Sequence, residues 1–243
     1  MSAETRPRPS LLEFLSTKEL YLGLSPSTVA ISELRSSPNY PNSPSIVRYG
    51  ETPELNTFDE FEGYGARLSG VWTPPVSGNY VFYMSADDNG ELWLSTNASP
   101  ANIVYIAREP VYAGRRVWTG ESAGGSRLTT PSPSGGLQAN ISTNISLVAG
   151  QQYYFETLVK EGGGGDNLAL SWQIPGGPVP VNGSLPTGGL GFAALADPVG
   201  AFITISRQPA STNIQPGQTA SFALRATGTN VNGNAPQIGR AHV

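Results

Sequence analysis

Two adjacent aspartates, Asp87 and Asp88, are the residues whose type and spacing most directly suggest chemistry. They lie between an aromatic and β-branched run at residues 79–85 and an alternating run at residues 91–95, so residues 78–95 are predicted to form a β-hairpin. Neighbouring side chains of an extended strand point to opposite faces. The two carboxylates could therefore bind one ion only across a bent backbone or a cis peptide. The alternative is a solvated turn, of which Asp-Asp-Asn-Gly is also typical.

Composition narrows the class of protein. The chain has 243 residues, 38% of them hydrophobic, which is enough for one large domain and part of another. With 29 glycines, 21 prolines and only 13% charged residues, short strands joined by turns are favoured and the fold class is all-β. A net charge of −4 without a basic cluster argues against a nucleic-acid partner and against anionic membrane surfaces. No apolar run is long enough for membrane insertion, and the absence of cysteine excludes disulfides and thiolate metal sites.

The only histidine, His242, lies in a tail whose origin we question. Residues 238–243 can be back-translated as ATC GGA AGA GCA CAC GTC, which resembles a widely used sequencing adapter. We therefore expect residues 237–243 to be an artefact and the natural fragment to end near Pro236. Without His242, Ser-His-Asp, Cys-His and histidine-ligated zinc sites are excluded, and catalysis would be left to carboxylates, Lys, Tyr and Ser.

Period-two patterns and turn residues predict the remaining elements. Strands are expected at residues 19–24, 64–74, 102–108, 141–148, 152–160 and 168–174, with a short helix at 28–35 and a loop at 121–136. The last strand is the clearest, because Leu168, Leu170, Trp172 and Ile174 share one face. Ala149-Gly150 predicts a second hairpin. Many short strands with frequent turns predict an antiparallel sandwich or barrel.

Two stretches together carry a family resemblance. Residues 64–95, YGARLSGVWTPPVSGNYVFYMSADDNGELWLS, and residues 145–172, ISLVAGQQYYFETLVKEGGGGDNLALSW, resemble the PA14 domain, an antiparallel β-sandwich named after the protective antigen of anthrax toxin. Residues 203–228, ITISRQPASTNIQPGQTASFALRATG, resemble the start of a bacterial immunoglobulin-like domain.

These resemblances imply a domain plan. Residues 1–17 would be a linker or frayed end, 18–190 the PA14-like domain, 191–201 a linker, 202–236 a truncated immunoglobulin-like domain and 237–243 the adapter artefact. The N-terminus lacks the apolar core of a signal peptide. Because the chain is expected to be a fragment, the resemblance still implies an extracellular or cell-surface protein.

The PA14 resemblance also implies a site. In sugar-binding members such as yeast flocculins, two successive aspartates joined by a cis peptide hold a calcium ion that contacts sugar hydroxyls. Asp87 and Asp88 match that pair. A later loop of those proteins supplies an asparagine side chain and backbone carbonyls, and its matching candidates here are Asp166 and Asn167, after the glycines at 162–165. The implied calcium site is Asp87, Asp88, Asp166 and Asn167.

The residues themselves are compatible with this site, and with simpler roles. Calcium takes 6 to 8 oxygen ligands, which two aspartates, an Asp-Asn pair and loop carbonyls could largely supply. A sugar would then contact Asp87, Asp88 and Asn167, with Trp93 and Trp118 as flat apolar faces. The alternatives are that calcium only stabilises the fold or is not bound, and that both tryptophans belong to the core.

The favoured function is a non-catalytic, calcium-dependent module that binds a glycan or polysaccharide. It would be a monomeric, adhesive domain of a larger bacterial surface or secreted protein. An accessory domain of a glycosidase or other enzyme is the second hypothesis, and a spacer without ligand the third. A glycosidase needs two carboxylates about 5 to 10 Å apart. Asp87 and Asp88 are too close together to share those roles.

Overall fold

The computed structural model describes residues 16–50, 52–55, 60–120, 126–184, 192–193, 202–207 and 225–229. The chain forms two compact units, Met1–Ala194 and Leu195–Val243. In the second unit, β12 (Phe202–Arg207) pairs antiparallel with β13 (Arg225–Thr229). β12 begins at the residue where the truncated immunoglobulin-like domain is expected to begin, whereas the immunoglobulin-like assignment stays a prediction. Residues 237–243, predicted to be an adapter artefact, lie outside the described residues.

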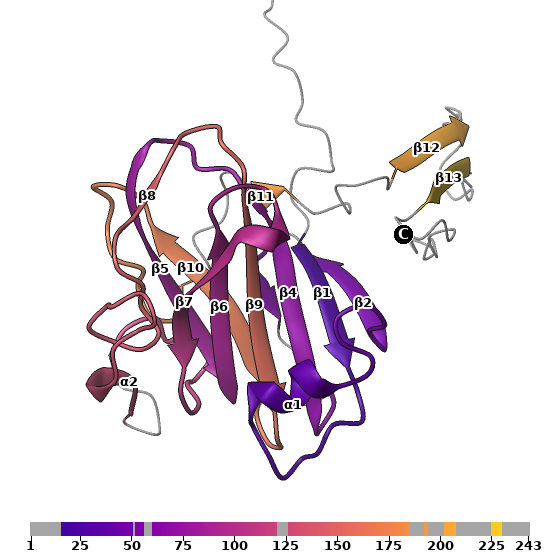
Figure 1. The fold of residues 1–243 in the computed structure, drawn as a ribbon, viewed down its shortest axis with the longest axis horizontal. Coiled ribbons are helices and arrows are strands. Elements are labelled where there is room, and N and C mark those ends of the chain that lie inside the picture. The colour runs from indigo at the N-terminus through magenta and orange to yellow at the C-terminus, as the bar shows by residue number, and fades with distance from the viewer. Residues whose placement is uncertain are drawn as a thin grey trace, which may run out of the picture. The chain divides into compact units, whose positions relative to one another are not determined.

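The first unit consists of two antiparallel sheets packed face to face (Figure 1). The larger sheet has the order β2-β1-β4-β9-β6-β7, with β11 also paired to β4, and the smaller has the order β3-β10-β5-β8. The bounds of the larger sheet are β1 Ser16–Tyr21, β2 Ile46–Gly50, β4 Tyr64–Trp72, β6 Asn89–Ser95, β7 Ile103–Glu109, β9 Tyr153–Glu161 and β11 Phe192–Ala193. Those of the smaller are β3 Glu54–Leu55, β5 Gly78–Asp87, β8 Ile145–Leu147 and β10 Asn167–Gln173. The helical turns α1 (Ile31–Ser36), η1 (Pro100–Asn102) and α2 (Ser126–Thr129) are short, so the prediction of an all-β sandwich is confirmed.

Alternating side chains of both sheets form the core. The ring of Trp72 on β4 lies 5.6 Å from that of Phe82 on β5 and 5.2 Å from that of Trp172 on β10, which locks the sheets together across the sandwich. Leu168 and Leu170 are buried beside Trp172, as their alternation predicted. Each such side chain contributes roughly 1.5 to 3 kcal/mol when fully buried. Ile174 lies beyond the end of β10 and is exposed.

Both predicted hairpins are wrong in the same way. β5 pairs with β10 and β8, whereas β6 pairs with β7 and β9, so the acidic corner carries the chain from one sheet to the other. The turn at Gly150 likewise connects β8 of the smaller sheet to β9 of the larger. A connection between sheets needs the same turn residues as a hairpin, and only long-range pairing distinguishes them.

Helix α1 covers part of the outer face of the larger sheet (Figure 1). Its Leu34 side chain lies so close to Gly65 on β4 that a Cβ there would be 2.5 Å from Leu34 Cδ1. The helix was expected at residues 28–35 and begins later, so residues 22–30 form a loop between β1 and α1. Lys160 near the end of β9 donates hydrogen bonds to this loop. None of the described helices is long and apolar enough to cross a membrane.

Candidate functional site

The candidate site lies where the chain crosses from β5 to β6. The peptide between Asp87 and Asp88 is cis, and both side chains are half-buried. Gly90 makes the crossing possible, because a Cβ at this position would be 2.6 Å from Met84 Cε and 2.8 Å from Ala86 Cβ. The first residues of β6 therefore pack directly against the end of β5.

A third carboxylate, that of Glu161, joins the two aspartates. One oxygen of each of Asp87, Asp88 and Glu161 lies within 4.8 Å of the others. Glu161 ends β9, where it continues the inward-facing row of Tyr153, Phe155 and Val159. Glu161 is not among the site residues predicted from the sequence. Its signal is present in the sequence, since an acidic residue at the end of an inward, apolar period-two row requires a buried partner.

Glu161 is buried without a compensating contact. Its side chain is 0% exposed, and neither carboxylate oxygen has a hydrogen-bond partner in the described part of the chain. Burial, followed by repulsion from Asp88 and Asp87, raises the pKa of Glu161 to about 8. A buried carboxylate is normally paired or bound to a metal because of its desolvation cost. Among the described residues, Glu161 therefore lacks a compensating positive contact.

The neighbouring cation, Lys160, does not fill that role. Its Nζ donates hydrogen bonds to the carbonyl oxygens of Ser25 at 2.8 Å, Thr28 at 2.9 Å and Glu161 at 2.6 Å. It also lies 3.6 Å from Glu33 Oε2. Burial lowers the pKa of Lys160, although Glu33 opposes that shift. Lys160 thus ties the loop at residues 22–30 to the end of β9 instead of pairing with the Glu161 carboxylate.

The predicted ligands Asp166 and Asn167 lie at the start of β10, beside the corner. Asp166 is buried and its Oδ2 accepts a hydrogen bond of 2.9 Å from the hydroxyl of Tyr64, while its charge contributes to the raised pKa of Glu161.

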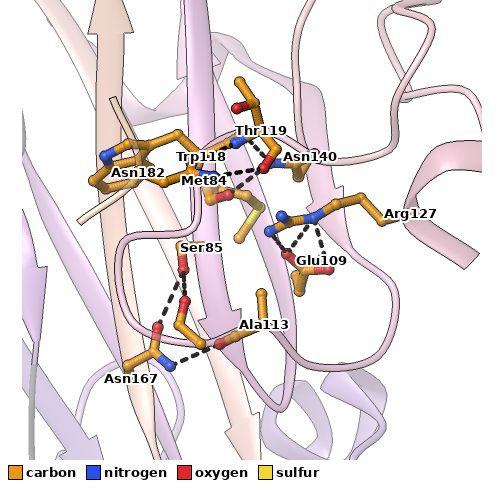
Figure 2. A network of polar contacts seen from close by, with 11 residues as sticks. Met84, Ser85, Glu109, Ala113, Trp118, Thr119, Arg127, Asn140, Asn167 and Asn182 are labelled. Carbon is orange, nitrogen blue, oxygen red and sulfur yellow. Dashed lines mark hydrogen bonds and ion pairs between the residues drawn. The ribbon is translucent and has the colours of Figure 1, made fainter. Parts of the chain in front are cut away.

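Asn167 pairs with Asp87 in the strand register. Its amide donates to Ala113 O at 2.9 Å and accepts from Ser85 Oγ at 3.3 Å (Figure 2). The structure brings both residues to the corner, and their role as ligands stays a prediction.

The glycine-rich loop at residues 162–165 also reaches the corner. The amide of Gly162 donates to Asp88 Oδ2 at 3.0 Å, and that of Gly164 donates to Glu62 at 3.1 Å. A Cβ on Gly162 would lie 3.2 Å from Pro26 O and 3.3 Å from Asp88 Oδ2. A side chain at this position would be crowded, so the glycine lets the loop approach both the acids and the loop at residues 22–30.

The two tryptophans expected to contact sugar lie elsewhere. Trp118 is 0% exposed and packs with Tyr83 and Ala169, so the prediction that it offers a face to a sugar is wrong. Its backbone is held by the side chains of Asn140 and Asn182 against the outer face of the smaller sheet (Figure 2).

Trp93 faces outward from the larger sheet, and its ring is in contact with other side chains of this protein. Its ring stacks on Tyr105 at 4.6 Å, and the guanidinium of Arg35 lies 5.1 Å from the ring centroid. It follows Asn89 by four strand positions, about 13 Å along β6. The structure therefore does not bring Trp93 to the acidic corner.

Comparison with known proteins gives partial similarities. No known family model matches the chain. A mouse N-acetyl-beta-glucosaminyl-glycoprotein 4-beta-N-acetylgalactosaminyltransferase 1 is 29% identical over 150 residues, which cover 60% of this chain and only 13% of the mouse protein.

Solved structures with some similarity include two adhesin domains. For the PA14 sugar-binding domain of an RTX adhesin, the identity is 12%, the coverage 68% of this chain and 92% of that one, and the TM-score 0.46. For the epithelial adhesin 9 A domain of Candida glabrata in complex with Galb1-4GlcNAc, the identity is 15%, the coverage 71% and 87%, and the TM-score 0.43. These values are low, so the function has to be argued from the site itself.

Proposed function

We propose that this chain is a calcium-dependent carbohydrate-binding module, of adhesive type, within a larger surface or secreted protein. The observation that carries the proposal is the carboxylate of Glu161, which is fully buried, without a hydrogen-bond partner among the described residues, and within 4.8 Å of Asp87 and Asp88 oxygens. Three carboxylates at this distance repel one another unless a cation lies between them.

The donor set fits calcium. Hard divalent cations prefer carboxylate, carbonyl and amide oxygens, and calcium tolerates the irregular geometry of 6 to 8 such ligands. Asp87, Asp88 and Glu161 would hold the ion, with Asp166 and Asn167 as the further donors at this corner. Magnesium fits less well because it demands near-ideal octahedral geometry.

A sugar would approach the ion from the outer side. Glu161 closes the site from the interior, whereas Asp87 and Asp88 are half-buried and border solvent. A bound calcium would supply open coordination positions for two adjacent hydroxyls. The PA14 resemblance of residues 64–95 and 145–172 supports carbohydrate as the ligand, and an extracellular or cell-surface location.

The same geometry argues against catalysis by these acids. A retaining glycosidase separates its carboxylates by about 5 to 5.5 Å and an inverting one by more, with both facing the sugar. Here Asp87 and Asp88 are adjacent in the chain, and Glu161 has no exposed surface from which to donate a proton to a substrate.

A second candidate is an accessory carbohydrate-binding domain of a glycan-modifying enzyme. The similarity to the mouse transferase favours it, since that protein is named for an activity on glycoproteins and the matching region is a small part of its length. Both candidates use the same site. The sequence of the gene on either side of this region would distinguish them, because an enzyme would encode a catalytic domain in the same reading frame.

The proposal is tested by titrating the metal-free chain with calcium in a calorimeter. We expect one site in the wild type and none in Asp87→Ala or Asp88→Ala, while Glu60→Ala, which removes an exposed carboxylate paired with Arg48, binds normally. A glycan array probed in calcium and in EDTA should give signals only in calcium. Equal uptake by the aspartate variants would disprove the metal site, and signals that persist in EDTA would disprove calcium dependence.

A further inference from the structure

Tyr112 is the exposed aromatic side chain at the acidic corner. It lies opposite Asp87 in an isolated antiparallel bridge and is 42% exposed. Directly opposed residues of an antiparallel pair have Cβ atoms about 4.5 to 5.5 Å apart on one face. The phenol ring of Tyr112 therefore projects from the same face as the Asp87 carboxylate. Among the aromatic side chains that the structure describes, it is the most exposed.

The short segment that carries Tyr112 is fixed from both sides. On one side, the Ala113 amide donates to Ala86 O at 2.8 Å, and the Asn167 amide donates to Ala113 O at 2.9 Å (Figure 2). On the other, the Asn89 side chain, oriented so that its nitrogen faces them, donates to the carbonyls of Pro110 at 3.0 Å and Val111 at 3.1 Å.

These anchors lie next to the acids of the candidate site. Asn89 directly follows Asp88, and Asn167 pairs with Asp87. The backbone at Tyr112 is thus positioned before any ligand arrives, which lowers the entropic cost of binding. Holding a large aromatic side chain in solvent beside a polar cluster has no role in the packing of the sandwich. Such exposed aromatics are common at binding sites.

We propose that Tyr112 is the stacking platform of the sugar site. Its ring would pack against the apolar C–H face of a pyranose whose two adjacent hydroxyls face the cation held by Asp87, Asp88 and Glu161. The ligand class is a terminal pyranose with a free vicinal diol. Tyrosine suits this position because its ring supplies apolar contact while its hydroxyl remains in water. This inference rests on the proposed function, and it replaces Trp93 and Trp118 as the aromatic contact.

The test uses proton NMR of the full chain with four probes, the methyl glycosides of galactose, glucose, mannose and fucose, in excess calcium. For any sugar that binds, we expect an upfield ring-current shift of its C–H protons. Tyr112→Ala should weaken binding at least about tenfold and remove that shift, whereas Tyr112→Phe should keep both. Val104→Ala, which truncates an exposed side chain on β7, is the matched control. Calcium affinity should be unchanged in all three variants.

The outcomes separate this inference from the proposed function. If a sugar binds Tyr112→Ala as tightly as the wild type, Tyr112 is not the platform and the calcium-dependent module still stands. If Tyr112→Ala loses calcium as well as sugar, the residue acts on the metal site and the stacking role is wrong. If none of the four sugars binds the calcium-loaded wild type, both the platform and this ligand class are contradicted, while calcium uptake is judged by its own titration.

Discussion

Glu161→Gln should stabilise the metal-free protein and destroy its response to calcium. The substitution keeps the size of the side chain and removes its charge. In the metal-free state the carboxyl is buried, has no hydrogen-bond partner in the described structure, and lies beside Asp87 and Asp88, so its ionised form, which carries that charge, is unfavourable. In the calcium-bound state the same charge would be a ligand.

The magnitude follows from the pKa of Glu161, which burial and then the neighbouring aspartates raise from 4.5 to about 8. At pH 7 the folded chain mostly keeps this carboxyl protonated, whereas the unfolded chain ionises it. Because the folded pKa is the higher one, stability is full below pH 4.5 and is lost as the pH rises towards 8. The loss at pH 7 is on the order of 3 kcal/mol. A buried glutamine amide without partners has a desolvation cost of its own, which offsets part of the stability recovered by the substitution. The net gain in unfolding free energy should therefore be about 1 to 2 kcal/mol.

Calcium should reverse the order of stability of the wild type and Glu161→Gln. At a hundred times its dissociation constant, a ligand stabilises the folded state by about 2.7 kcal/mol. For a domain of this size, that corresponds to a rise in Tm of roughly 5 to 10 °C. We expect the wild type to show this rise and Glu161→Gln to show little of it. In EDTA the variant should melt at the higher temperature, and in calcium the wild type should.

The assay is thermal unfolding at pH 7 in EDTA and in excess calcium, with Glu156→Gln as the control. Glu156 is also buried on β9, but it accepts hydrogen bonds from Tyr40 at 3.2 Å and Tyr154 at 3.0 Å and lies 3.7 Å from Arg67. Its neutralisation should lower Tm in both buffers and leave the calcium shift intact. If Glu161→Gln is the less stable protein in EDTA, or keeps the full calcium shift, the assignment of Glu161 as a buried ligand is refuted.

Two further substitutions test the packing that positions the corner. Gly90→Ala should cost about 1 to 3 kcal/mol of unfolding free energy in urea titrations, because its methyl group would overlap Met84 and Ala86; an unchanged midpoint would mean that the two strands are not in close contact. Arg127→Leu should cost about 3 to 5 kcal/mol, because it leaves the fully buried Glu109 carboxylate unpaired. Adding Glu109→Leu should recover most of that loss, and a double variant no more stable than Arg127→Leu would contradict the pairing.

Local pattern predicted the elements of the sandwich well where alternation was strong. The face shared by Leu168, Leu170 and Trp172 is buried as predicted, because burial of one sheet face imposes a period of two directly on the sequence. The same pattern could not tell which strands pair. The turn residues at Gly90 and Gly150 are compatible both with a hairpin and with a crossing between sheets, and the structure has crossings at both.

The sequence did not predict which aromatic side chain lies at the acidic corner. Trp118 and Trp93 are large and apolar, and such side chains are placed equally well in a core or a stacked cluster. Trp118 is buried against Tyr83 and Ala169, and Trp93 lies between Tyr105 and Arg35. Tyr112 carries no signal in its local sequence. Its position opposite Asp87 results from a loop that returns to the end of β5.

The sequence by itself determined that the chain builds an all-β sandwich and that two adjacent aspartates lie at one corner, because strand alternation and turn residues are local properties. Only the tertiary structure decided what those aspartates meet. Asp88 and Gly162 are hydrogen-bonded although they are 74 positions apart in the sequence. Glu161 directly precedes Gly162 and therefore also lies beside Asp88. Alternation can say that Glu161 points inward. It cannot predict that Asp87 and Asp88, at the end of β5 in the other sheet, lie beside this end of β9. That proximity depends on how the two sheets pack against each other.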